Sequence, residues 1–338
     1  MTSLLERFDD MATSLGGFYS AWAVYLGLDL GLFARIRSAG ASGVTPAELA
    51  AQTDCVAEPV ATWVRLAHAV DLIEFDGERV RPIDEVLAVL LDDDRPEYLG
   101  GQFVSTVVSS LDYERLTDFF RSGRPIAGRP PRFHRAIEAV TAQDIAVFFQ
   151  EGLAELPDLA AELSVGGRVL DVACGGGRWL VAVARRFPAT SLVGVECEPD
   201  SVIRARRRVL DSGLQDRIEI EDRDPADLPW GPEFNLVYLQ DALHELVDPV
   251  GTLRAAWAVV RPAGRLIVLD WCLPSSVEES RSLQGAMLWG IQVDELYQGT
   301  RMWTHVGLLG LIAEAGIPIP TVIDLPSGAT VFVSGRRG

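Results

Sequence analysis

Arg168-Val169-Leu170-Asp171-Val172-Ala173-Cys174-Gly175-Gly176-Gly177 is an apolar run that ends in three consecutive glycines. The run is typical of a buried strand, and the glycines that follow it predict a tight turn. Residues 178–187 then predict a helix, and residues 191–196 predict a second buried strand. Strand, turn, helix and strand form a βαβ unit. We therefore predict an α/β fold whose sheet is doubly wound and Rossmann-like.

Two carboxylates beside the glycine turn indicate the kind of ligand. Glycines let a ligand approach the backbone at a helix N-terminus. The dinucleotide pattern GxGxxG fails here, because its third small position, counted from Gly175, is Leu180. Asp171 at the strand end disfavours a pyrophosphate and favours positive charge, which S-adenosylmethionine carries as an ammonium and a sulfonium. Glu196 ends the next strand, where a carboxylate can accept both ribose hydroxyls.

Length and charge restrict the class of protein. A chain of 338 residues fits two domains, at roughly 100–200 residues per domain. The formal net charge of −18 counts against binding to nucleic acid or to an anionic membrane. No apolar run reaches the roughly 20 residues of a membrane-spanning helix. We expect a cytoplasmic protein, because a signal peptide is not apparent and the four cysteines are scattered.

The first part of the chain, residues 1–105, predicts a winged helix. Thr45-Pro46-Ala47-Glu48 has the pattern of a helix start, and Asp76-Gly77 between two short extended runs predicts a hairpin. The expected helices cover residues 11–38, 46–52 and 57–70. A winged helix binds DNA or dimerises. The second helix offers Arg65 and His68 beside Glu58, a poor phosphate surface, so we favour dimerisation.

A helical connector is expected over residues 106–162, before a catalytic domain over residues 163–338. The connector is rich in arginine, and we expect it to contribute to an acceptor pocket. Arg124 and Arg129 are candidates for binding a substrate carboxylate, since arginine suits that group. A solvated arginine face is the alternative, because surface ion pairs contribute only about 0–1 kcal/mol.

Residues 169–177 resemble the first motif of class I methyltransferases, with Ala173 in place of the first glycine. Residues 217–224, 234–239 and 253–270 are similar to later segments of that family. The winged helix narrows the resemblance to the small-molecule O-methyltransferase-like group, which dimerises through this domain, so a homodimer is implied. The resemblance assigns these residues to the S-adenosylmethionine site: Asp171, Ala173, Gly175, Gly177, Glu196, Asp224 (toward the adenine) and Gln240.

His244 follows the fourth strand, on the side where open α/β sheets bind ligands. In the O-methyltransferases that the chain resembles, a histidine here is the general base. His244, Glu245, Asp294 and His305 also look like the metal set of bacterial α-keto-acid C-methyltransferases from peptide-antibiotic pathways. Mixed nitrogen and oxygen ligands of this kind suit Zn²⁺ or Fe.

The favoured interpretation is metal-assisted C-methylation at the β-carbon of a 2-oxo acid, in secondary metabolism. A metal that chelates the carboxylate and ketone stabilises the enolate. The catalytic candidates are His244, Glu245 and Tyr297, and Tyr297 or a metal-bound hydroxide is the base if His244 binds metal. One alternative is O-methylation of a phenol or similar hydroxyl with His244 as base. A second, of another class, is a non-catalytic regulator that binds a ligand.

Overall fold

The computed structural model describes residues 3–336, and the chain divides into two compact units. The first unit consists of Met1–Glu114 and Pro130–Gln143, and the second of Arg115–Arg129 and Asp144–Gly338. The connector expected over residues 106–162 is therefore shared between both units. In the described part of the chain, no helix combines the length and apolar character needed to cross a bilayer.

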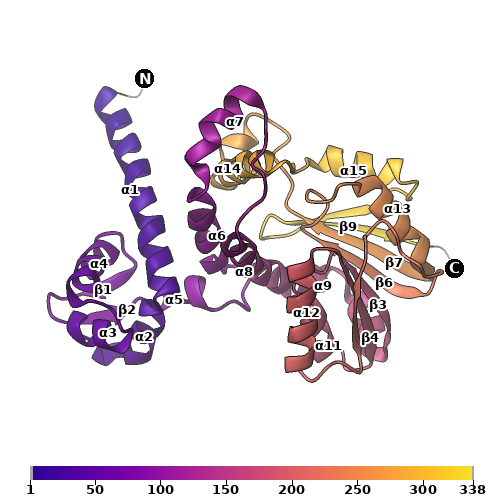
Figure 1. The fold of residues 1–338 in the computed structure, drawn as a ribbon, viewed down its shortest axis with the longest axis horizontal. Coiled ribbons are helices and arrows are strands. Elements are labelled where there is room, and N and C mark those ends of the chain that lie inside the picture. The colour runs from indigo at the N-terminus through magenta and orange to yellow at the C-terminus, as the bar shows by residue number, and fades with distance from the viewer. Residues whose placement is uncertain (1–2, 337–338) are drawn as a thin grey trace. The chain divides into compact units, whose positions relative to one another are not determined.

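The first unit is mainly helical and carries one small hairpin (Figure 1). Its elements are α1 (Leu4–Asp29), α2 (Leu32–Ala39), α3 (Pro46–Gln52), α4 (Ala57–Ala69), β1 (Ile73–Phe75), β2 (Val80–Pro82), α5 (Asp84–Leu91), α6 (Gly100–Ser110) and the first part of α8 (Pro131–Val147). Trp63 packs in the core of this unit. The centroids of its ring and the Phe33 ring are 5.4 Å apart, and its Nε1–H donates a hydrogen bond to the Ala23 carbonyl at 2.9 Å. The predicted helices and hairpin of a winged helix are confirmed.

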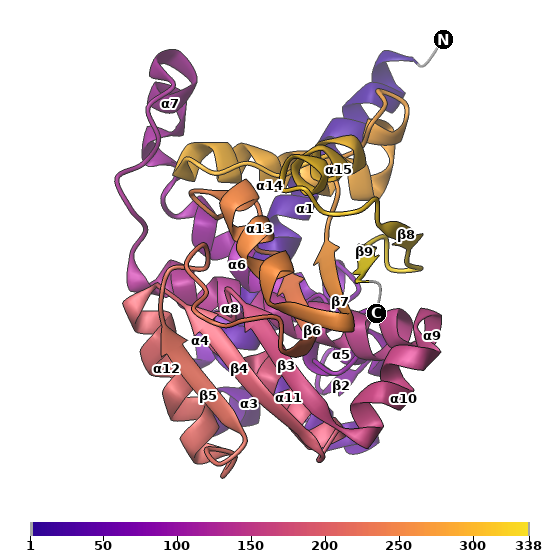
Figure 2. The same cartoon turned by 90° about the vertical axis from the view of Figure 1, so that its right-hand side faces the viewer.

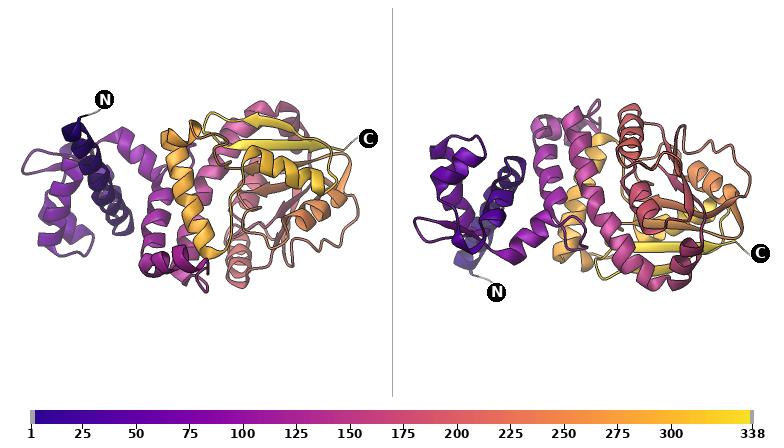
Figure 3. Two further views of the ribbon diagram at one scale, coloured as in Figure 1. Left: turned by 90° about the horizontal axis from the view of Figure 1, so that it is seen from above. Right: turned by 90° about the horizontal axis from the view of Figure 1, so that it is seen from below.

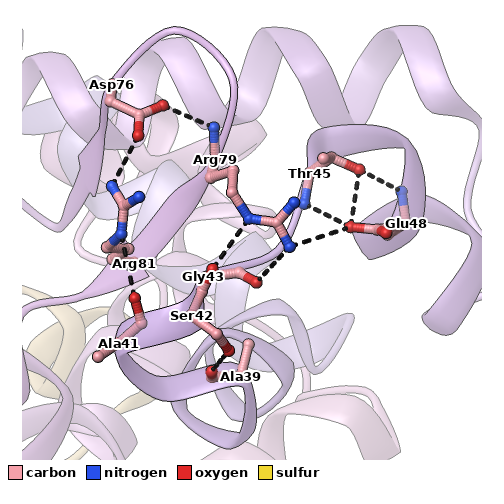
Figure 4. Close-up of polar contacts among 9 residues, drawn as sticks. All are labelled: Ala39, Ala41, Ser42, Gly43, Thr45, Glu48, Asp76, Arg79 and Arg81. Carbon is pink, nitrogen blue, oxygen red and sulfur yellow. Dashed lines mark hydrogen bonds and ion pairs between the residues drawn. The ribbon is translucent and has the colours of Figure 1, made fainter.

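The arginines of the wing bind their own domain (Figure 4). Arg79 donates to the carbonyl oxygens of Ser42 and Gly43 at 2.9 and 3.0 Å. Arg81 donates to the Ala41 carbonyl at 3.2 Å and to Asp76 at 2.8 Å. Basic side chains that are engaged in this way are poorly placed to contact phosphates, which supply most of the affinity for nucleic acid. The wing therefore favours the dimerisation interpretation over DNA binding.

The second unit contains a seven-stranded sheet in the order β5-β4-β3-β6-β7-β9-β8. The strands are β3 (Gly167–Val172), β4 (Thr190–Glu196), β5 (Ile218–Asp222), β6 (Phe234–Gln240), β7 (Val260–Asp270), β8 (Thr321–Asp324) and β9 (Thr330–Gly335). The first five run parallel, whereas β9 pairs antiparallel with both β7 and β8, at the edge drawn in yellow (Figure 3). Parallel strands end at the same edge of the sheet, which brings the loops after β3, β4 and β6 together.

Helices cover both faces of this sheet (Figure 2). One face packs against α10 (Pro157–Val165), α11 (Arg178–Arg186) and α12 (Pro199–Asp211), and the other against α13 (Pro249–Val259) and α15 (His305–Glu314). The remaining helices are α7 (Leu116–Ser122), the end of α8 with a π-helical turn (Phe148–Gly152), α9 (Leu153–Glu155) and α14 (Leu283–Gln298). The predicted doubly wound α/β architecture is confirmed.

Arg217, just before β5, ties α11 to the start of β4. Its guanidinium donates to the carbonyl oxygens of Ala184 at 2.8 Å, Phe187 at 2.9 Å and Thr190 at 2.8 Å. The first two carbonyls belong to the end of α11, where helix carbonyls lack partners within the helix. One planar side chain thus satisfies several acceptors that hold the βαβ unit together.

We predict that Arg217→Met lowers the free energy of unfolding by about 3 kcal/mol, because hydrogen bonds to a charged group contribute about 1.5–3 kcal/mol each. Arg217→Lys should lose less, since an ammonium keeps the charge but not the fork. Urea denaturation followed by tryptophan fluorescence measures the difference. Arg207→Met is the matched control, because that guanidinium is 73% exposed beside Asp211. An equal loss in both methionine variants would contradict the prediction.

Candidate active site

The glycine turn after β3 has a left-handed backbone at three positions. Ala173, Gly175 and Gly177 have φ values of +59°, +52° and +72°. Gly177 is the residue that precedes α11, so the turn presents the N-terminus of that helix. Ala173 adopts a conformation that favours glycine, which agrees with its place at the first glycine of the motif. The turn is fixed because Arg208 of α12 donates to the Gly176 carbonyl.

Glu196, the last residue of β4, is the second part of this site. Its carboxylate accepts three backbone N–H groups, from Gly175 at 2.9 Å and from Cys197 and Glu198 at 2.8 Å each. These bonds fix the carboxylate in position and leave lone pairs for a further donor, since an ionised carboxylate has about four acceptor sites.

Asp171 lies beside Glu196 and makes the site strongly acidic. Its side chain is 3% exposed, and burial, together with the charge of Glu196, raises its pKa well above the usual range. Across residues 3–336, no basic side chain pairs with Asp171 or Glu196. Two buried carboxylates without a cation favour a cationic ligand over a phosphate.

Asp224 and Gln240 lie at the same edge of the sheet. Asp224 follows β5 by two residues, is exposed, and accepts the N–H of Ala226 at 2.9 Å. Gln240 ends β6 and accepts the hydroxyl of Tyr238 at 2.9 Å. Their contacts with a methyl donor remain predictions.

His244 lies in the turn after β6, with its side chain 8% exposed. Its Nδ1 atom is buried, has no hydrogen-bond partner among the described residues, and lies 3.7 Å from Oδ1 of Asp241. Asp241 has a φ of +46°, a strained conformation that is typical of functional sites. Because Nδ1 is turned toward the protein, Nε2 is the ring nitrogen left to meet a substrate.

Carboxylates surround His244 and raise its basicity. Burial by itself lowers the pKa of His244, but the charges of Asp241, Asp270, Glu245 and Glu295 outweigh burial and raise that pKa to about 9. Burial raises the pKa of Asp270 to about 7, and the nearby His244 opposes that rise. The cluster therefore stabilises positive charge on the imidazole.

The structure does not bring the predicted metal ligands together. Nε2 of His305 hydrogen-bonds Oγ1 of Thr330 at 2.8 Å and lies 3.1 Å from Asp324. Asp294 forms an ion pair with Arg129, and Glu245 is exposed. Among residues 3–336, the group of His, Cys, Asp and Glu whose ligand atoms all lie within 4.8 Å of one another is Asp241, His244 and Asp270. His244, Glu245, Asp294 and His305 therefore do not fit one metal ion, and no step is assigned to a metal.

Two other predicted side chains serve the packing of α14. Arg129 is 3% exposed, since its guanidinium pairs with Asp294 and lies 5.3 Å from the ring of Tyr297. Tyr297 is 2% exposed, and its ring packs edge-on against Phe119, with the two ring centroids 5.7 Å apart. Arg124 is exposed. Arg129 is thus occupied by an internal carboxylate, which leaves Arg124 as the exposed member of the predicted pair.

Sequence reasoning missed the acidic groups around His244. Asp241 directly follows β6 and Asp270 ends β7, so both occupy the strand-end position that identified Glu196. A search for carboxylates at the end of every predicted strand would therefore have found these two residues. Asp144 on α8 and Glu295 on α14 carried no local signal, because distant parts of the chain bring them to the site.

We predict that Glu196→Gln lowers the affinity for S-adenosylmethionine at least tenfold. The substitution replaces a charged hydrogen-bond acceptor by a neutral amide. Hydrogen bonds to a charged group contribute about 1.5–3 kcal/mol each, and a tenfold change in affinity corresponds to about 1.4 kcal/mol. Isothermal titration calorimetry measures the change. Glu219→Gln, the same substitution at an exposed site on β5, is the control. Unchanged affinity in Glu196→Gln would remove this residue from the donor site.

Comparisons with known proteins agree with this geometry. The family model "Methyltransferase domain" matches residues 169–264. Aclacinomycin 10-hydroxylase RdmB of Streptomyces purpurascens is 32% identical over 277 residues, which are 78% of this chain and 73% of that protein.

Solved structures show the same fold. The mitomycin 7-O-methyltransferase MmcR has a TM-score of 0.70 at 19% identity, covering 98% of both chains. Human N-acetylserotonin methyltransferase, solved in complex with S-adenosylmethionine, has a TM-score of 0.73 at 15% identity, also covering 98% of both chains. The chain therefore belongs to the class I S-adenosylmethionine-dependent methyltransferase family.

Proposed function

We propose that the protein transfers the methyl group of S-adenosylmethionine to a hydroxyl of a small molecule, with His244 as general base. The observation that carries this proposal is the placement of His244, at the sheet edge shared with Glu196 and among carboxylates. The name of the structurally similar MmcR, a mitomycin 7-O-methyltransferase, supports O-methylation and a natural-product acceptor. C-methylation of a 2-oxo acid loses its support, because the predicted metal ligands do not converge.

The pKa of His244 suits the removal of a phenolic proton. A phenol titrates near 10 and an unperturbed histidine near 6.5, a gap that costs about 4.8 kcal/mol for proton transfer. With the pKa of His244 raised to about 9, the remaining gap costs about 1.4 kcal/mol. The carboxylates lower the cost because they stabilise the imidazolium that forms.

The donor lies opposite this base in the proposed reaction. Nε2 of His244 takes the hydroxyl proton, and the oxygen attacks the methyl carbon as the sulfonium leaves as a thioether. Bringing oxygen and methyl to about 3–3.5 Å in line can lower the barrier by roughly 7–11 kcal/mol. In this proposal Asp171 and Glu196 hold the donor and His244 prepares the acceptor.

Screening acceptors tests the proposed reaction. Phenols, polycyclic hydroxyaromatics and 2-oxo acids are incubated with S-adenosylmethionine, and products are identified by mass spectrometry. O-methylation predicts that a hydroxylated compound gains one methylene, with no turnover of 2-oxo acids.

A second candidate function is hydroxylation, favoured by the name of RdmB, whose match covers 78% of this chain. A product that gains one oxygen atom would support that alternative.

We predict that kcat/KM rises with pH up to about 9 and that His244→Gln removes this dependence. Only the neutral imidazole accepts a proton, and the pKa of His244 is about 9, so the active fraction grows about tenfold per pH unit below that value. The substitution should lower kcat about 10²- to 10⁴-fold, the usual contribution of a general base. Affinity for S-adenosylmethionine should stay unchanged. Wild-type kcat in His244→Gln would refute the role of this residue.

We also propose that the protein is a homodimer through the first unit. Helix α1 exposes large apolar side chains at helical spacing: Leu4, Phe8, Met11 and Leu15 are 89%, 66%, 66% and 61% exposed. Such a stripe lies on one face of a helix and is costly to leave in water. A second copy of the same helix offers a matching apolar face.

The double variant Phe8→Asp/Met11→Asp should be a monomer, because a charge in an apolar contact costs several kilocalories per mole when it is left unpaired. Light scattering at micromolar concentration measures the mass. Arg7→Asp, on the same helix but beside Asp10, serves as the control for added negative charge. If wild type and double variant have equal mass, α1 is not the interface.

A further inference from the structure

We propose that Asp241 is a positioning residue of this site: its left-handed backbone holds the carboxylate beside Nδ1 of His244 and so leaves the lone pair of Nε2 for the acceptor. Asp241 directly follows β6 and precedes His244 by three residues. The inference rests on the proposed function for the role of His244, whereas the effect of Asp241 on the ring is tested independently.

The backbone of Asp241 is strained and anchored at the edge of the sheet. Its φ is +46°, and its N–H donates to the carbonyl oxygen of Leu269 on β7 at 2.9 Å. A residue with a side chain keeps such a conformation only where the surrounding structure fixes it. Aspartate and asparagine tolerate it better than other residues with a side chain. The chain therefore leaves the sheet at Asp241 in a fixed direction.

The turn after Asp241 brings the ring of His244 back to it. The N–H of Glu245 donates to the Ala242 carbonyl at 3.0 Å, which closes a turn with His244 in its third position. The His244 carbonyl accepts the N–H of Arg301 at 3.4 Å. The turn is thus held at the sheet through Asp241 and at the segment before α15 through Arg301.

The carboxylate of Asp241 is the acid found at Nδ1 of His244. Oδ1 of Asp241 lies 3.7 Å from Nδ1, which is buried and has no hydrogen-bond partner among residues 3–336. This distance is longer than a hydrogen bond, and catalytic contacts are often long until the substrate binds. A carboxylate at Nδ1 favours the neutral tautomer with its proton on that nitrogen, so Nε2 keeps its lone pair.

Other acids surround the ring at greater distance. They come from separate elements: Asp270 at the end of β7, Glu245 in the turn, Glu295 on α14 and Asp144 on α8. Within residues 3–336, Asp241 is the acid that brings a carboxylate oxygen within 4.0 Å of a ring nitrogen of His244. Its charge also raises the pKa of His244 more than that of any other acid.

Nitrogen NMR of labelled histidine tests the contact in the full-length protein, and His244→Gln identifies the signal among the four histidines. Asp241→Asn removes the charge and keeps a residue that tolerates the left-handed backbone. In this variant the pKa of His244 should fall from about 9 toward the ordinary 6.5. The share of the Nε2–H tautomer should rise, because an amide can also donate to Nδ1.

The matched control is Asp248→Asn, the same change in the loop that follows β6. Asp248 caps α13, and asparagine also caps helices, so the titration of His244 should stay as in wild type. A wild-type titration and tautomer in Asp241→Asn would overturn the proposal.

Asp241→Gly separates positioning of the ring from support of the fold. Glycine adopts a positive φ without strain, and the substitution removes one of several neighbouring negative charges. The urea concentration at the unfolding midpoint should therefore stay equal or rise, while the pKa of His244 falls as in Asp241→Asn. A lower midpoint with a wild-type titration of His244 would show that Asp241 only supports the fold, and would overturn the proposal.

With an acceptor from the screen, the kcat/KM profile of Asp241→Asn should reach its plateau at lower pH than wild type, and the plateau should be lower. A weaker base is deprotonated earlier but removes a phenolic proton less readily. Neither the NMR titration nor the unfolding uses an acceptor. Failure of those two measurements therefore concerns Asp241 alone, and failure of the acceptor screen concerns the proposed reaction alone.

Discussion

Negative charge buried at the carboxyl edge of a parallel sheet is the constraint on which this site depends. Asp171, Glu196 and Asp270 each end a strand or lie near its end, and the parallel topology brings those ends together. Burial makes each charge costly unless protons, N–H donors or a cation compensate it. Glu196 receives three backbone N–H groups, whereas no basic side chain of residues 3–336 pairs with Asp171. In the proposed reaction, the cationic methyl donor supplies the missing charge.

The same constraint explains the chemistry of His244. An isolated buried histidine is a weak base, because burial disfavours the imidazolium. Here the surrounding acids reverse that effect, so the imidazole becomes a better acceptor for a weakly acidic hydroxyl. In the proposed reaction, donor binding and the basicity of His244 share one physical origin, which is an excess of carboxylates over cations at one edge of the sheet.

Local sequence patterns predicted much of this fold, and long-range contacts account for what they missed. The βαβ unit around Asp171 and the helix start at Thr45 were readable, because each depends on neighbours in sequence. Helix α1 begins at Leu4 and not at the predicted residue 11. Ser3 and Glu6 cap this N-terminus, each accepting a hydrogen bond from the backbone N–H of the other. Strand β9, inserted between β7 and β8, went unpredicted, because its place depends on partners far along the chain.

The predicted metal set failed for the same reason. His305 and Asp294 are chemically suitable ligands, but spacing along the chain does not reveal which partners they meet. In the folded protein those partners are Asp324 and Thr330 for His305, and Arg129 for Asp294. Residue types in sequence predicted a donor site that remains a prediction, whereas only tertiary contacts revealed the acids around His244.

The anchoring of the wing has an evolutionary consequence. Arg79 and Arg81 hold the hairpin through the carbonyl oxygens of Ala41, Ser42 and Gly43. A descendant that redirected these guanidinium groups to an outside partner would release the hairpin from its own domain. The wing can drift in its exposed residues while its two arginines stay under selection for folding.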